Sequence, residues 1–211
     1  MSGNFAGVVW TLVLIFTLLG AAYFVSRKNA ELARKIIHIG VAHWYFIYVA
    51  FFTDPLPAVL GLAAFAAFNA FLTSKGVFAS SADKEGERRS WGMVWYPLSV
   101  LIMVLLSAVG IGDNTALGCG LLGMGWGDGL AALIGKRFGK RRIYGNKTWA
   151  GTLTAFAAIM AVSLLISRRP VMALVCGIVG AVLETFTPRD LDNISVPLGI
   201  YAVAAVWSAY V

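Results

Sequence analysis

The sequence predicts an all-α integral membrane protein, a polytopic transmembrane bundle of about eight helices in one membrane domain that covers residues 1–211. Three observations predict this fold class. Hydrophobic residues make up 59% of the chain and charged residues 13%, whereas soluble domains have about 45–50% and about 25%. The mean hydropathy is +0.79. Apolar runs of roughly 17–21 residues, long enough to cross hydrocarbon, follow one another with short polar breaks.

These apolar runs define the elements in order. The first run has no charged residue and no basic segment before it, so we expect a retained helix rather than a cleaved signal peptide. Pro55, Pro57 and Pro170 stand at helix starts, where a missing N–H group costs little. The predicted spans are 5–25, 36–53, 56–73, 91–111, 115–135, 149–167, 170–186 and 194–211.

Basic residues gather in alternate loops. All 17 Lys and Arg residues except Arg168 and Arg169 follow the first, third, fifth and seventh spans. The positive-inside rule therefore places these four loops in the cytoplasm and both termini outside. Topology and contact with anionic lipid account for most of the net charge of +7, but they leave the acids among these basic residues unexplained.

Asp128 is the most informative of those acids. It stands in the glycine-rich run 123–129, with apolar sequence on both sides. A carboxylate at membrane depth is costly unless it meets a cavity or a partner, which makes Asp128 a candidate functional residue. Gly127 and Gly129 remove side-chain bulk and would let a phosphate approach the backbone. The alternative is a glycine-rich face for helix packing that tolerates one acid.

The basic segment 135–148 predicts a phosphate contact. It contains Lys140 and ends in Lys147 and Thr148, which open the sixth span. An ammonium group, a hydroxyl and the free N–H groups of a helix start can converge on an anion. The spacing differs from that of a Walker A loop, and an ordinary basic cytoplasmic loop is the alternative.

A second cationic cluster opens the second span. Arg34, Lys35 and His38 are neighbours on a helix, because residues three and four positions apart share a face. Such a patch suits a phosphate at the membrane surface. His43, in contrast, is expected to be a structural residue.

The seventh span ends in further acids. Glu184 follows an apolar stretch and so lies at membrane depth, and Asp192 and Asn193 follow it in the segment 188–193. Glu184 and Asp192 could share a divalent cation with Asp128, since such a cation binds through few protein oxygens and keeps some of its water.

In sequence order, these residues resemble a known family over roughly residues 31–200. The family is that of the polytopic CTP-dependent lipid kinases, which includes dolichol kinase, phytol kinase and the CTP-dependent diacylglycerol kinase, and which is distantly related to phosphatidate cytidylyltransferase. The sequence lacks the His-Gly-Gly…Asp-Arg ending of the cytidylyltransferases, which favours the kinases. The resemblance rests on Arg-Lys-x-x-His at 34–38, Gly-Asp-Gly at 127–129, Gly135, Gly139, Lys147-Thr148, Gly151-Thr152, Glu184, Asp192-Asn193 and Pro197.

The resemblance implies a Mg²⁺-dependent kinase with CTP as phosphoryl donor. The acceptor would be the terminal hydroxyl of a membrane lipid alcohol, whether a polyprenol or dolichol, a phytol-like isoprenoid or a diacylglycerol. It implies catalytic roles for Asp128, Lys147, Glu184 and Asp192, with the three acids as metal ligands. Nucleotide and phosphate contacts would come from Arg34, Lys35, His38, Gly127, Gly129, Lys140, Thr148 and Asn193.

Two other functions stay open at this point. A cytidylyltransferase would use the same polar groups for attack at the α-phosphorus of CTP. A small-molecule transporter would also have intramembrane acids, but these are expected near the midplane and on paired halves. No nucleic-acid partner is expected, and glycine-rich faces could pack within one chain or between copies in a homo-oligomer.

Overall fold

The computed structural model describes residues 3–76, 91–188 and 190–210, and nearly all of them are helical. The basic residues Lys84, Arg88, Arg89 and Arg189 lie outside the described residues. In chain order the elements are α1 (Gly3–Ser26), α2 (Ala30–Ala42), α3 (Trp44–Phe51), α4 (Leu56–Ser74), α5 (Gly92–Ala108), α6 (Asn114–Phe138), β1 (Arg142–Tyr144), β2 (Lys147–Thr148), α7 (Trp149–Ser167), α8 (Pro170–Phe186) and α9 (Asp192–Tyr210).

The helices confirm the predicted all-α membrane bundle. By length and apolar composition, α1, α4, α6, α7 and α9 can each cross a membrane, while α5 and α8 are apolar helices of 17 residues each. The second predicted span, 36–53, is wrong as a single helix, because α2 ends at Ala42 and α3 begins at Trp44. The N–H group of His43 bonds to the Gly40 carbonyl and that of Phe46 to the His43 carbonyl. Both bonds reach three residues back instead of four, which separates the two helices.

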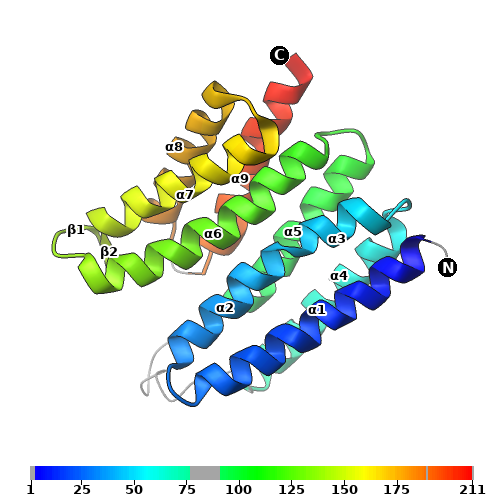
Figure 1. Cartoon of the computed structure of the whole chain (residues 1–211), viewed down its shortest axis with the longest axis horizontal. Coiled ribbons are helices and arrows are strands. Elements are labelled where there is room, and N and C mark those ends of the chain that lie inside the picture. Colours follow the sequence, from blue (N-terminus) through cyan, green and yellow to red (C-terminus); the bar gives the residue numbers. More distant parts are fainter. Residues whose placement is uncertain (1–2, 77–90, 189, 211) are drawn as a thin grey trace.

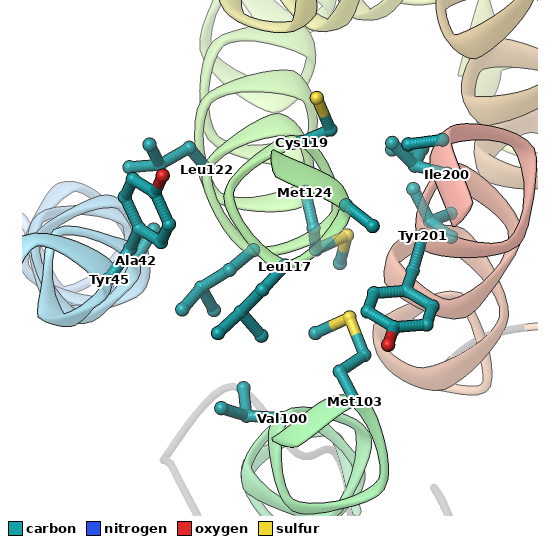
Figure 2. Close-up of a cluster of buried hydrophobic side chains, with 14 of the residues drawn as sticks. Ala42, Tyr45, Val100, Met103, Leu117, Cys119, Leu122, Met124, Ile200 and Tyr201 are labelled. Atoms are coloured by element: carbon teal, nitrogen blue, oxygen red, sulfur yellow. The ribbon is translucent and has the colours of Figure 1, made fainter. Parts of the chain in front are cut away.

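Helix α6 is the axis of the bundle. Its neighbours surround it on several sides, with Tyr45 and Ala42 reaching it from α3 and α2, Val100 and Met103 from α5, and Tyr201 from α9 (Figure 2). Glycines make these close approaches possible. A Cβ atom added at Gly125 would lie 2.4 Å from the Cβ of Ala42. The glycine-rich run therefore packs within one chain, and homo-oligomerisation stays a prediction.

The bundle divides into two parts. Helices α6 to α9 pack most extensively with one another, whereas α1 makes its main contacts with α2 and α3. One end of the bundle carries the α1–α2 turn and the β1–β2 ribbon, and the opposite end carries both termini and the α5–α6 turn (Figure 1). We call the first the ribbon end. The loops predicted to share one side, where the structure describes them, thus lie at the same end.

Candidate active site

Lys147 brings two carboxylates together at the ribbon end. Its Nζ lies 2.5 Å from Glu184 Oε1 and 3.5 Å from Asp192 Oδ2. Glu184 is buried, with 4% of its surface exposed. Burial alone would lower the pKa of Lys147, but the negative charges of Glu184 and Asp192 outweigh it and raise the pKa. The ammonium group therefore stays charged at neutral pH and neutralises part of two acidic side chains.

The β1–β2 ribbon positions this lysine. Arg142 pairs with Thr148 and Tyr144 with Lys147 in an antiparallel register. The ring of Tyr144 packs on Phe186 at the end of α8, with 5.6 Å between ring centroids. Since Glu184 precedes Phe186 by two residues on the same helix, this contact holds the ribbon beside the acid.

Thr148, which is predicted to contact phosphate, also stabilises the start of α7. It is the N-cap of α7, and its Oγ1 accepts a hydrogen bond from the Gly151 N–H at 3.2 Å. A Cβ atom added at Gly151 would lie 3.1 Å from the Ala131 carbonyl oxygen, so glycine here lets α7 approach α6 closely. The start of α7 and the wall of the site are built by the same residues.

A second ion pair lies on the other side of the site. Lys35 Nζ on α2 donates to Asp128 Oδ2 at 2.6 Å, and His38 Nε2 lies 3.3 Å from the same oxygen. The ring of Tyr96 on α5 lies over His38 with centroids 4.6 Å apart. The acid in the glycine-rich run thus has a cationic partner from a helix distant in sequence. This ion pair accounts for the presence of an acidic residue, Asp128, in an apolar helix.

Hydrogen bonds connect the start of α9 to the N-cap of α5. Asn193 Nδ2 donates to Asp192 Oδ1 at 3.0 Å and to the carbonyl of Asp190 at 3.3 Å. Asp190 Oδ2 in turn accepts from the Trp91 N–H at 3.0 Å. These bonds orient Asp192 toward Lys147, so Asn193 is placed to position an acid as well as to contact a nucleotide.

Three of the residues predicted to contact nucleotide or phosphate have other surroundings in the structure. Gly127 and Gly129 face neighbouring helices, since added Cβ atoms would meet Ile159 at 2.7 Å and Ile39 at 2.4 Å. The structure gives these two glycines a packing role, which the sequence had offered as the alternative. Lys140 is exposed and is absent from the residues that line the cavity described below. Direct phosphate contacts by these three residues stay predictions.

Of the three carboxylates predicted to bind a divalent cation, only two lie together. Among the residues that the structure describes, no three of His, Cys, Asp and Glu stand close enough to hold a metal together. Glu184 and Asp192, however, already converge on one cation, the ammonium of Lys147. Mg²⁺ commonly uses one or two carboxylates and takes its other ligands from phosphates and water. This pair fits that pattern, while Asp128 stands in a separate ion pair.

One continuous cavity of about 1340 Å³ joins both ion pairs to an apolar corridor. Its polar part is lined by Arg34, Lys35, Lys136, Lys147 and the acids Asp128, Glu184 and Asp192. The corridor is the remaining part, between α1, α2, α4 and α5. Its wall includes Leu12, Leu19, Leu62, Phe65, Pro97 and Val100.

Sequence reasoning missed several residues of this site. Tyr96 lies in an apolar run, where an aromatic residue looks like any core residue. Thr185 bonds to Thr152 at 2.8 Å and lies 3.4 Å from Glu184 Oε2, linking α7 to the buried acid. The signal that could have found Thr185 is its place beside Glu184 in an otherwise apolar helix.

A helical membrane bundle in which paired charges adjoin an apolar corridor fits a membrane protein that binds an amphipathic ligand such as a lipid. No family model matches the chain, and no solved structure matches it. The chain is similar to a phytol kinase from Synechocystis sp., with 35% identity over 193 residues that cover 85% of this chain and 80% of the relative. The chain belongs to the family of polytopic lipid kinases that includes phytol kinase.

Proposed function

We propose that this protein transfers the γ-phosphoryl group of CTP to the hydroxyl of a membrane lipid alcohol, and that the alcohol is a phytol-like isoprenoid. The observation that carries the proposal is the cavity that joins an apolar corridor to a cluster of lysines and carboxylates. The similarity to a phytol kinase supports phosphoryl transfer and the kind of acceptor. The alternative acceptors, polyprenols, dolichol and diacylglycerol, are tested in the same assay.

The cations of the polar part would bind the triphosphate. Arg34, Lys35, Lys136 and Lys147 line one cavity, and phosphoryl transfer needs such charges because negative charge spreads over the transferred group. The ammonium of Lys147, held between two acids, would exchange one carboxylate for a phosphate oxygen as the nucleotide enters.

Glu184 and Asp192 would hold Mg²⁺, with Asp128 as the third acid facing the same cavity. Mg²⁺ held by these carboxylates would neutralise phosphate charge. Lys35 and His38 would meanwhile hold the Asp128 carboxylate in place.

In the reaction, the lipid oxygen forms a bond to the γ-phosphorus while the bond from that phosphorus to the β–γ bridging oxygen breaks. CDP leaves, and the hydroxyl proton passes to one of the three carboxylates. The tail stays in the corridor during this step, which keeps the hydroxyl at the polar part. The abundance of basic residues at the ribbon end supports a cytoplasmic location for the reaction, where CTP is found.

Position-specific labelling tests the proposal. Purified protein in detergent is given phytol, a dolichol-type polyprenol or diacylglycerol together with Mg²⁺ and CTP labelled at the γ- or the α-phosphorus. We expect the γ-label in the lipid product, the α-label in released CDP, and no transfer after Mg²⁺ is chelated. Entry of the α-label into lipid with release of pyrophosphate would establish a cytidylyltransferase instead. Equal rates with γ-labelled ATP would refute the dependence on CTP.

A further inference from the structure

The corridor ends in a cluster of aromatic rings. Trp44 and Phe52 line the cavity, with ring centroids 6.0 Å apart, and Tyr48 packs on both at 5.3 and 5.7 Å. Trp44 and Tyr48 are buried. These rings belong to α3 and its C-cap, at the end of the bundle opposite the ribbon end (Figure 1).

Contacts with α1 fix this aromatic cluster. Trp44 Nε1 donates to Thr11 Oγ1 at 2.9 Å, and the Thr11 hydroxyl donates to the Gly7 carbonyl at 2.7 Å. The Phe52 ring fills the space beside Gly7, since a Cβ atom there would come within 2.6 Å of it. The cluster is therefore held on two sides and forms a fixed wall.

The distance from the polar part to this wall limits the length of a tail. On α1 the lining residues run from Ser26 to Val8, which corresponds to about 27 Å at 1.5 Å per residue. Between Lys35 and Trp44 the same rise gives about 14 Å. An extended chain advances roughly 1.3 Å per main-chain carbon, given C–C bonds of about 1.5 Å. The corridor therefore suits roughly 11 to 21 main-chain carbons, or about three to five isoprene units.

One wall of the corridor has open space partway along. Gly61 on α4 lines the cavity, and a Cβ atom added there would meet no atom within 4 Å. Gly61 lies eight residues, about 12 Å of helix, beyond the lining residue Asn69. A large side chain at this position would project into the path of a long tail but would leave room for a short one.

From these contacts we infer that Trp44 and Phe52 form the floor of the corridor and set the maximum tail length of the lipid alcohol. The inference rests on the proposed function for the identity of the occupant. The floor accepts a tail of about four isoprene units, which lies near the middle of this range, and hinders a longer one. Trp44 and Phe52 are thus specificity-determining residues that touch the tail and take no part in phosphoryl transfer.

The test is a chain-length profile. Phosphorylation is measured for isoprenoid alcohols of two, three, four and five isoprene units with wild-type protein and with Trp44→Ala, Phe52→Ala and Gly61→Phe. Shortening a floor residue should raise the kcat/KM ratio of the five-unit to the four-unit alcohol about tenfold or more. Gly61→Phe should lower the ratio of the four-unit to the two-unit alcohol by a similar factor. Gly61→Phe fills open space, so its result does not depend on a truncated core.

Two matched controls separate the floor from general damage. Trp10 stacks on Phe51 at the same end of the bundle but is half exposed and lies outside the cavity lining. Gly20 also has nothing within 4 Å of an added Cβ atom and lies outside the lining. Trp10→Ala and Gly20→Phe should keep the wild-type profile.

Two outcomes would overturn the inference. Unchanged profiles in all three corridor variants would do so even if every protein phosphorylates its alcohol, and so would equal shifts in the two controls. If no alcohol is phosphorylated, the proposed function fails on its own, and crosslinking to photoreactive isoprenoid alcohols of the same lengths then decides about the floor. A crosslinking cutoff that moves with Trp44→Ala supports the floor, and crosslinking that is independent of tail length refutes it.

Discussion

Lys147→Met tests whether the lysine serves catalysis or only neutralises its acidic neighbours. The change keeps much of the side-chain volume and removes the ammonium that lies 2.5 Å from Glu184 Oε1. Because Glu184 is 4% exposed, its charge loses its partner inside the protein. Breaking a buried pair costs about 3–5 kcal/mol. The Lys147 side chain is 32% exposed, so we expect the free energy of unfolding to fall by an amount at the lower end, about 3 kcal/mol.

The same variant should lose turnover by more than stability explains. Removing one charge-stabilising group from a transition state typically lowers kcat about 10²–10³-fold. The second variant needed is Lys147→Met with Glu184→Gln, which removes the unpaired charge. Its melting temperature in detergent should recover most of the loss seen in Lys147→Met. Its kcat should be lower than that of Glu184→Gln alone, which is the reference because Glu184 is itself a proposed Mg²⁺ ligand.

Assays of thermal unfolding and of labelled CTP turnover on the same preparations measure the two effects separately. A double variant with the same kcat as Glu184→Gln alone would show that Lys147 only balances Glu184, and the proposed phosphate contact would be refuted. Unchanged nucleotide affinity and unchanged rate in Lys147→Met would show that the segment 135–148 is an ordinary basic loop.

Three further predictions follow from other parts of the structure. Asp128→Asn should abolish turnover while the protein still unfolds cooperatively in detergent, and full activity in this variant would remove Asp128 from the site. Gly125→Ala should lower the free energy of unfolding by about 1–3 kcal/mol, because the added Cβ overlaps α2, whereas Gly20→Ala should leave it unchanged or raise it slightly. Single cysteines near Arg141 should be labelled by an impermeant reagent only from the cytoplasmic side, and those near Asp54 only from the opposite side. The reverse pattern would refute the positive-inside assignment.

The sequence was sufficient for the helices because a membrane span depends on a local property, the length of an apolar run. Asp54 and Asp113 stand in two of the turns between helices. Asp113 is the N-cap of α6 and accepts from the Ala116 N–H, and Asp54 accepts from the Leu56 N–H just before α4. The break at His43 was not visible, since the apolar run continues through it. Only the hydrogen bonds of the folded backbone show that two helices share this span.

The structure shows which candidate residues pair with one another, and the sequence did not predict these pairs. A helical period shows that Lys35 and His38 share a face, but it does not say that this face meets Asp128, ninety-three residues away. Lys147 and Glu184 were both selected, and their direct contact depends on the ribbon packing against α8. Glycines were the least predictable, because the same residue serves phosphate approach and helix packing. The neighbouring side chains show a packing role for Gly127 and Gly129, and a phosphate contact by them stays a prediction.

The two-part bundle separates tasks that many enzymes combine in one set of residues. The densely packed part α6–α9 carries the three acids and, at the start of α7, Lys147, whereas the corridor wall comes largely from α1, α2, α4 and α5. Lys35 and His38 on α2 belong to the polar part, but substitutions in α1 and α4 would change the corridor wall without touching the side chains proposed to bind phosphate. A lineage built on this plan can therefore acquire new lipid preferences by gradual change at the corridor while its reaction chemistry is inherited intact.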